Sequence, residues 1–172
     1  LVVLVLIASG ALAADWPCYQ GDALRTGVTG DTLTFPLAPS WQYEPPQPPR
    51  PAWPEPGRTL HLMDFDYAFE PVVADNVVFF GSSADDTVRA LDLTSGALRW
   101  QFVTRGPVRF APHVAGGKCF VAGDDGYVYC LDARTGKVEW EFRAAQNDRQ
   151  ALGNGRMIAR SPCRSGVLVD DG

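Results

Sequence analysis

Three pairs of neighbouring aspartates are the most chemically suggestive side chains in this 172-residue chain. They are Asp85-Asp86, Asp124-Asp125 and Asp170-Asp171. Paired carboxylates can bind calcium or share the work of a general acid and base. Each pair, however, follows a short run of apolar residues at a point where a turn is expected, and Asp favours turns because its side chain bonds nearby backbone amides. We therefore expect these pairs to be turn residues and expect neither metal ligands nor catalytic residues among them.

Thiols are the second candidate chemistry, and the chain has four: Cys18, Cys119, Cys130 and Cys163. No CxxC or Cys/His spacing is present, which disfavours a zinc site. Cys119 and Cys130 fall on the two strands of one expected hairpin. A two-residue loop at Asp124-Asp125 would place the two thiols directly opposite each other, whereas a three-residue loop ending in Gly126 would put them on opposite faces of the sheet. We expect free buried thiols.

Histidine chemistry is not indicated. His61 and His113 are the only histidines, and no Ser-His-Asp arrangement is evident near either. His113 is expected to pack at the surface or between elements. A glycine-rich turn, Gly153–Arg156, lies in a segment from Ala144 to Arg164, and a long loop of this kind is the best local candidate for a ligand-facing element.

The elements that position these residues are indicated by an internal repeat. Ala90–Trp100 is echoed by Cys130–Trp140, with Leu, Asp, Gly and Trp recurring at a constant offset of 40 residues. Repeats of about 40 residues built from short strands are typical of β-propeller blades. The echo also extends upstream, where Pro71–Gly81 aligns with Pro112–Gly123.

Each copy divides into four short strands separated by Asp-Asn, Gly-Gly, Asp-Gly or Thr-Gly turns. In the second copy we expect strands near 111–115, 118–122, 127–132 and 137–143. No segment shows a sustained 3.6-residue apolar period, so little helix is expected. The predicted fold class is therefore all-β, a β-propeller of four-stranded antiparallel blades.

Six repeated residues have a structural interpretation: Asp92, Gly96, Trp100, Asp132, Gly136 and Trp140. The aspartates end a strand and can accept hydrogen bonds from turn amides, and the glycines supply a positive φ at low cost. Each tryptophan can lay its ring against the neighbouring blade and bury about 150–250 Å².

At these residues the chain resembles exported bacterial quinoprotein-like β-propellers, whose blades carry a tryptophan-docking motif. That group includes dehydrogenases dependent on pyrroloquinoline quinone (PQQ) and cofactor-free relatives such as the propeller lipoprotein of the outer-membrane β-barrel assembly machinery. The resemblance covers about Phe69 to Glu141, together with the start of a third copy at 166–172. The sequence departs from the usual pattern at Ala97 and Cys130, where Lys and Ala are common.

The expected organisation begins with residues 1–13 as a secretory signal peptide without its n-region, because Leu1–Leu12 is apolar and precedes a small-x-small site at Ala11–Ala13. A proline-rich arm at 14–67 follows. Similar proteins suggest that Ser40–Tyr43 supplies a strand closing the ring. PQQ-like repeats then occupy 68–172: blade 1 at 68–108, blade 2 at 109–143, an insertion at 144–165 and the start of blade 3 at 166–172. We expect these residues to be the N-terminal part of a ring of six to eight blades.

Two functions are compatible with these observations. The first is a non-catalytic extracytoplasmic binding or assembly scaffold, expected in the periplasm, with a protein or cell-envelope partner and no cofactor. The alternative, implied by the resemblance, is a PQQ-dependent alcohol or sugar dehydrogenase with calcium, whose site would lie mostly outside these residues. The net charge of −5 without a Lys/Arg run argues against nucleic acid as a partner, and Leu1–Leu12 is too short to span a bilayer, so no membrane span is expected in the mature chain.

Overall fold

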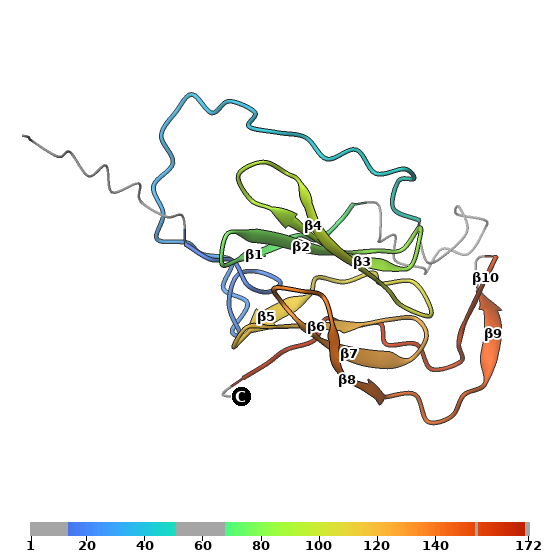
Figure 1. The fold of residues 1–172 in the computed structure, drawn as a ribbon. Coiled ribbons are helices and arrows are strands. Elements are labelled where there is room, and N and C mark those ends of the chain that lie inside the picture. The colour runs from blue at the N-terminus through green and yellow to red at the C-terminus, as the bar shows by residue number, and fades with distance from the viewer. Residues whose placement is uncertain (1–13, 51–67, 154, 171–172) are drawn as a thin grey trace, which may run out of the picture.

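The computed structural model describes residues 14–50, 68–153 and 155–170. This part of the chain is all-β and forms three antiparallel sheets (Figure 1). The first sheet has the order β1 (Val72–Ala74), β2 (Val77–Ser82), β3 (Thr87–Asp92) and β4 (Leu98–Val103). The second has the order β5 (His113–Ala115), β6 (Lys118–Ala122), β7 (Tyr127–Asp132) and β8 (Val138–Arg143). A separate hairpin pairs β9 (Gln150–Gly153) with β10 (Arg156–Ala159). The predicted four-stranded antiparallel blades are thus confirmed.

Tight turns between the first two strands of each blade explain the Asp-Asn and Gly-Gly pairs of the repeat. Asp75 and Asn76 have φ values of 50° and 60°, and Gly116 and Gly117 have 55° and 73°. Positive φ at both central residues is the requirement of a two-residue hairpin turn that follows the twist of its strands. The two copies therefore form the same type of turn with different residues.

A β-bulge in each outer strand sets the direction of the repeated tryptophan. Ala90 pairs with Trp100, but the next pair is Leu91 with Leu98, which leaves Arg99 as an extra residue. Blade 2 has the same irregularity between Cys130 and Leu131. A bulge bends the strand and shifts its side-chain alternation. Trp100 and Leu98 of β4 therefore face opposite sides of their sheet, as do Trp140 and Val138 of β8.

The two blades stack face to face, and the main core lies between them (Figure 1). Blade 1 contributes Phe79, Val88 and Trp100 to this core, and blade 2 contributes Tyr129 and Leu131. The other face of blade 1 is also covered. There a second cluster joins β2 and β3 to aromatic residues outside the sheet: Trp41, Tyr43 and Phe69 against Val78, Phe80 and Leu91. Cover on both faces explains why every residue of β2 is buried.

The far face of blade 2 is open along its outer strand. Val138, Trp140 and Phe142 are 44%, 44% and 61% exposed, whereas Trp100 is 8% exposed. In the described residues the Trp140 ring is therefore not covered by a neighbouring blade, and its packing against a third blade stays a prediction for the full-length protein. The ring is exposed because no further sheet lies beyond β8 in the described residues.

The segment expected to begin a third blade is not a strand here. Residues 162–170 run without strand pairing, although the Val169 amide donates to Nδ1 of His113 at 2.9 Å. A strand is defined by a neighbouring strand, and none of the described strands pairs with this segment. The expected insertion at 144–165 contains the β9–β10 hairpin.

The N-terminal arm adds backbone bonds to the inner edge of both blades. Trp16 and Val73 exchange two backbone hydrogen bonds of 2.8 and 2.9 Å, and the Val114 amide donates to the Pro17 carbonyl at 2.8 Å. The arm therefore bridges β1 and β5, the first strand of each blade. The expected signal peptide lies outside the described residues, and within them no helix is long and apolar enough to cross a bilayer.

Candidate functional site

The repeated aspartates organise the turn between the last two strands of each blade. In blade 1, Oδ1 of Asp92 accepts the Ser95 amide at 2.8 Å, and the Gly96 amide donates to the Asp92 carbonyl at 2.8 Å. In blade 2, Asp132 accepts the Thr135 amide at 2.7 Å. These bonds stabilise the ionised form, so the pKa of Asp92 is lowered, first by the Arg99 side chain, and that of Asp132 is lowered, first by the Thr135 hydroxyl.

Trp100 lies directly on the equivalent turn of the next blade. Its Nε1 donates to the Ala133 carbonyl at 2.9 Å. Gly136 has a φ of 70°, and a Cβ atom added there would lie 2.6 Å from the Trp100 ring. Glycine is thus needed at this position for two reasons, the left-handed backbone and the close approach of the ring. The contact connects a residue of blade 1 to the turn of blade 2.

Trp41 makes the same contact with blade 1 from outside the repeat. Its Nε1 donates to the Leu93 carbonyl at 2.8 Å, and a Cβ atom on Gly96 would lie 2.7 Å from its ring. Leu93 and Gly96 correspond to Ala133 and Gly136 at the 40-residue offset. Trp41 therefore occupies the position that the tryptophan on the outer strand of a preceding blade would occupy. The repeat alone did not reveal this match, because Trp41 lies outside both copies.

Two of the acidic pairs, Asp85-Asp86 and Asp124-Asp125, lie in the turns between the second and third strands of the blades, at an end of the blades here called the loop end. Asp171 of the third pair lies outside the described residues. The loop end comprises the β2–β3 turn, the β4–β5 connection, the β6–β7 turn and the segment 144–165, all on the right of Figure 1. Asp124 is fully buried there. Its carboxylate accepts Nε of Arg109 at 2.7 Å and Nε of Arg164 at 3.2 Å. This carboxylate thus joins the connection between the blades to the segment that follows blade 2.

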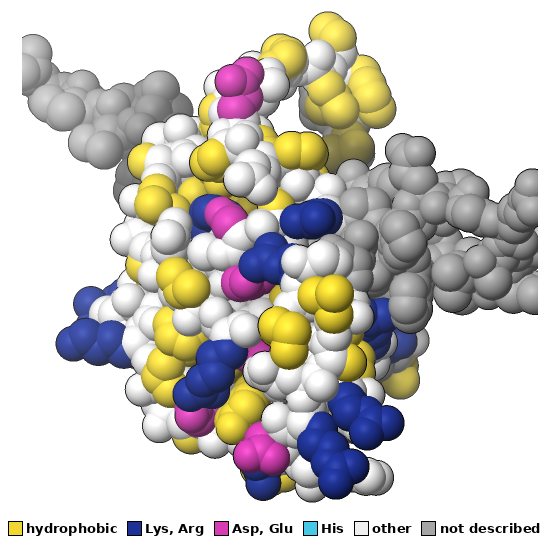
Figure 2. Space-filling view, turned by 90° about the vertical axis from the view of Figure 1, so that its right-hand side faces the viewer, with side chains coloured by type: hydrophobic (Ala, Val, Ile, Leu, Met, Phe, Trp, Pro, Cys, Tyr) yellow, Lys and Arg dark blue, Asp and Glu magenta, His cyan; other side chains and the backbone are white. Residues whose placement is uncertain are grey.

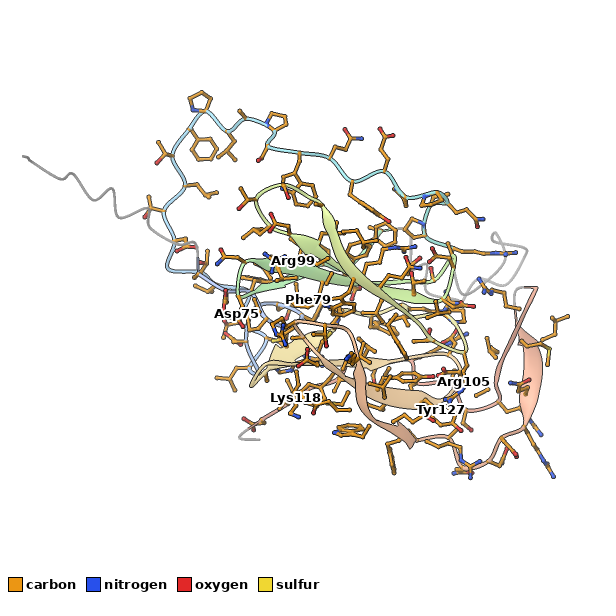
Figure 3. All side chains as sticks on the ribbon, in the orientation of Figure 1. Asp75, Phe79, Arg99, Arg105, Lys118 and Tyr127 are labelled. Carbon is orange, nitrogen blue, oxygen red and sulfur yellow. The ribbon has the colours of Figure 1, made fainter. Side chains whose placement is uncertain are left out.

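The other turn aspartates also connect elements. Asp125 accepts the Tyr129 hydroxyl at 2.5 Å and the Arg105 amide at 3.1 Å. Figure 3 shows Arg105 beside Tyr127, and the guanidinium carbon lies 4.6 Å from that ring centre. Asp86 pairs with Arg156 of β10. The expectation of turn positions agrees with the structure for Asp85-Asp86 and Asp124-Asp125, but their ion pairs across elements were not foreseen.

Asp85 provides a test of this network in acid. Burial alone would raise the pKa of Asp85, but hydrogen bonds from Arg89, Ser82 and Thr87 lower it to about 2. A carboxylate with a lowered pKa stabilises the fold above its unfolded pKa, near 3.8, and this contribution is lost as the pH falls through about 2.

We expect Asp85→Asn to remove this acid sensitivity, so that the full-length variant loses about 1 kcal/mol less unfolding free energy than the parent between pH 5 and pH 2. Urea unfolding at a series of pH values measures the difference. Asp86→Asn is the control, because burial raises the pKa of Asp86 and its contribution has the opposite sign. Parallel pH profiles for the parent and Asp85→Asn would contradict the assignment.

The remaining candidate residues have packing positions. Cys119 pairs with Leu131 and Cys130 pairs with Phe120, so the two thiols face opposite sides of the sheet, as the longer-loop alternative requires. Both are free and buried, and burial raises the pKa of each. His113 is also buried, which lowers its pKa. His61 lies outside the described residues, and Gly153–Arg156 forms the β9–β10 turn, of which Asn154 is not described.

A cavity of about 230 Å³ lies beside the segments that lead into β1 and β5, the first strands of the two blades. It is lined by the approach to β1, the approach to β5, residues 165–168 and the N-terminal arm, including Glu70, Phe110, Tyr19 and Arg25. Arg25 lies over the Tyr19 ring at 5.8 Å. Because the first strand of a blade borders the central channel of a propeller, this cavity is the candidate ligand site of the described residues.

The donor set of this cavity does not fit a calcium–quinone site. Calcium takes six to eight oxygen ligands. Glu70 is the one carboxylate that the described chain contributes to the lining, and its Oε2 already accepts the Ala111 amide at 2.8 Å. Among the described residues no group of three or more His, Cys, Asp or Glu side chains is arranged to hold a metal ion.

Comparison with known proteins assigns the family. The model of the family described as outer membrane protein assembly factor BamB matches residues 41–171, more than half of the chain. The chain belongs to this family. The residues matched to the BamB family include Trp41 and both blades. A separate comparison with curated proteins finds no match.

One solved structure supports the fold of the chain. Quinohemoprotein alcohol dehydrogenase from Comamonas testosteroni is 21% identical over 81% of this chain, with a TM-score of 0.59, and at this identity it shows the fold alone. Matches of lower coverage include a europium-containing methanol dehydrogenase (30% identity, 44% of this chain, TM-score 0.40) and BamB from Moraxella catarrhalis (23%, 44%, 0.38). The chain spans 21%, 15% and 26% of the lengths of these three proteins.

Proposed function

We propose that the full-length protein is a non-catalytic extracytoplasmic scaffold that binds another protein of the cell envelope. Membership of the BamB family supports an assembly role. The apolar Leu1–Leu12 segment supports export, with the periplasm as the expected location. No nucleic acid and no resident cofactor are part of this proposal.

The observation that carries the proposal is the position of the N-terminal arm on the inner edge of the blades. Trp16 and Pro17 bond to Val73 of β1 and Val114 of β5, so the chain itself fills backbone positions that face the propeller channel. A cofactor held at the axis would need side chains converging there from several blades. In the described residues, backbone groups at this inner edge are bonded to the N-terminal arm. This arrangement favours binding of a partner by the outer and loop surfaces of the blades.

The test is quinone binding by the full-length protein. After incubation with calcium and PQQ followed by desalting, we expect no retained quinone absorbance and no oxidation of alcohols or sugars with a dye acceptor. The control is an authentic PQQ-dependent dehydrogenase carried through the same steps. Stoichiometric quinone retention with dye reduction would overturn the scaffold function in favour of an oxidoreductase.

A further inference from the structure

The β9–β10 hairpin stands beside the blades at the loop end and is anchored to both (Figure 1). Nη1 of Arg156 donates to the Ala84 carbonyl of the β2–β3 turn at 2.6 Å. At the other end of β10, the Ala159 amide donates to the Asp124 carbonyl at 2.8 Å. The hairpin is therefore held in a defined place by backbone and side-chain bonds.

The outer side of this hairpin carries an exposed apolar pair. Leu152 and Met157 are cross-strand partners and are 75% and 54% exposed. Beside them lies a groove of about 290 Å³, bordered by the hairpin together with Pro162 and Arg164. Contiguous exposed apolar area can mark a binding surface, whereas single exposed apolar residues are normal on any protein.

The charge of this segment is opposite to that of the chain. Residues 143–164 contain five arginines and one aspartate, although the whole chain has a net charge of −5. Arg156 and Arg164 are engaged with Asp86 and Asp124. The others, Arg143, Arg149 and Arg160, are exposed.

Two of these exposed arginines are neighbours at the base of the hairpin, where the Arg160 amide donates to the Arg149 carbonyl at 2.9 Å. Figure 2 views this side of the molecule and shows Lys and Arg side chains gathered over its lower part near hydrophobic atoms. The surface therefore combines positive charge with apolar contact area, which complements an acidic partner.

The backbone of the hairpin offers a third recognition element. β9 and β10 pair only with each other within the described strands. The Ala159 amide at the outer edge of β10 donates to Asp124 of blade 2, so the edge that faces away from the blades is that of β9. An extended peptide can add to such an edge through main-chain hydrogen bonds, while its alternate side chains reach neighbouring pockets.

We propose that the β9–β10 hairpin is the docking site for an extended acidic segment of a partner protein, in which apolar residues alternate with Asp or Glu. The apolar residues contact Leu152 and Met157, and the carboxylates lie near Arg149 and Arg160. This inference rests on the proposed scaffold function and assigns the chemistry of the partner.

The test uses the full-length protein and a fluorescein-labelled decapeptide of alternating glutamate and valine, with binding followed by fluorescence polarisation. We expect binding that weakens with salt, and a lysine–valine decapeptide should bind at least about tenfold more weakly. The double variant Arg149→Glu/Arg160→Glu and the double variant Leu152→Ser/Met157→Ser should each weaken binding of the acidic peptide by about tenfold or more.

The matched control changes the same residue types at the opposite end of the blades. Leu98→Ser/Arg134→Glu alters two exposed residues there and should leave the affinity unchanged. Equal binding of the two peptides, no binding of the acidic peptide, or an equal loss in the control variant would overturn the docking site. Failure of the docking site alone leaves the scaffold function in place, whereas quinone retention overturns that function whichever peptide binds.

Discussion

Trp100→Ala should lower the unfolding free energy of the full-length protein by about 3–5 kcal/mol, the cost typical of removing a large buried aromatic side chain. The ring is 8% exposed, lies 5.9 Å from the Phe79 ring centre and covers the Gly136 turn. Truncation would also leave the Ala133 carbonyl without its indole donor. Both losses fall at the contact between the two blades, so the variant should unfold at lower denaturant concentration.

Equilibrium denaturation of the full-length protein measures this effect, with Gln101→Ala as the matched control. Gln101 neighbours Trp100 on β4 but is exposed, so its truncation should change the free energy by less than about 0.5 kcal/mol. Trp100→Phe should be intermediate, because it keeps much of the apolar contact and loses the hydrogen bond. Similar small effects for Trp100→Ala and Gln101→Ala would contradict the role of this tryptophan in joining the blades.

Much of the fold could be predicted because the repeat places turn chemistry at fixed intervals. The strands β6 and β7 begin and end where the sequence pattern predicted, and β5 and β8 begin only two residues and one residue later. Asp-Asn and Gly-Gly pairs mark turns that need positive φ, and few other residues adopt that conformation cheaply. Local backbone requirements of this kind leave a direct trace in sequence.

Contacts between distant segments are not marked by the 40-residue repeat. The docking of Trp41 on the Leu93–Gly96 turn spans more than fifty residues and begins in a region without the 40-residue pattern. The signal was available in the residue itself, because a tryptophan in a sequence that resembles a ring-closing strand has the same role as Trp100. Recognising it required the turn geometry that the structure provides.

The hairpin at 144–165 shows a different limit. Its strands have four residues each and carry Gly, Ala and Arg with little alternation, so the strand signal is weak. Tertiary bonds of Arg156 and Ala159 hold the hairpin in place. The sequence indicated an exposed loop there, whereas the structure shows a defined element with an apolar pair and a positive charge.

The acidic turns were predicted as turns, but the burial of Asp124 was not. An Asp in a turn is normally solvated, and only the approach of Arg109 and Arg164 from two other segments removes it from water. Removing one partner of a buried ion pair leaves the other charge desolvated and uncompensated. Asp124 should therefore be more sensitive to substitution than its turn position suggests.

Asp124→Ala should destabilise the full-length protein by about 3–5 kcal/mol, because the buried Arg109 would lose the Asp124 carboxylate as an ion-pair partner. Denaturant unfolding measures the loss, and Asp148→Ala, at an exposed position of the same insertion, should change the free energy by less than about 0.5 kcal/mol. The double variant Asp124→Leu/Arg109→Met tests whether the loss of stability comes from an uncompensated buried charge or from the loss of the carboxylate's shape and bonds. If uncompensated charge causes the loss, the double variant should recover part of the stability that Asp124→Ala loses. A double variant at least as unstable as Asp124→Ala would show instead that the geometry of the loop end, with its backbone bonds to β10, requires the carboxylate itself.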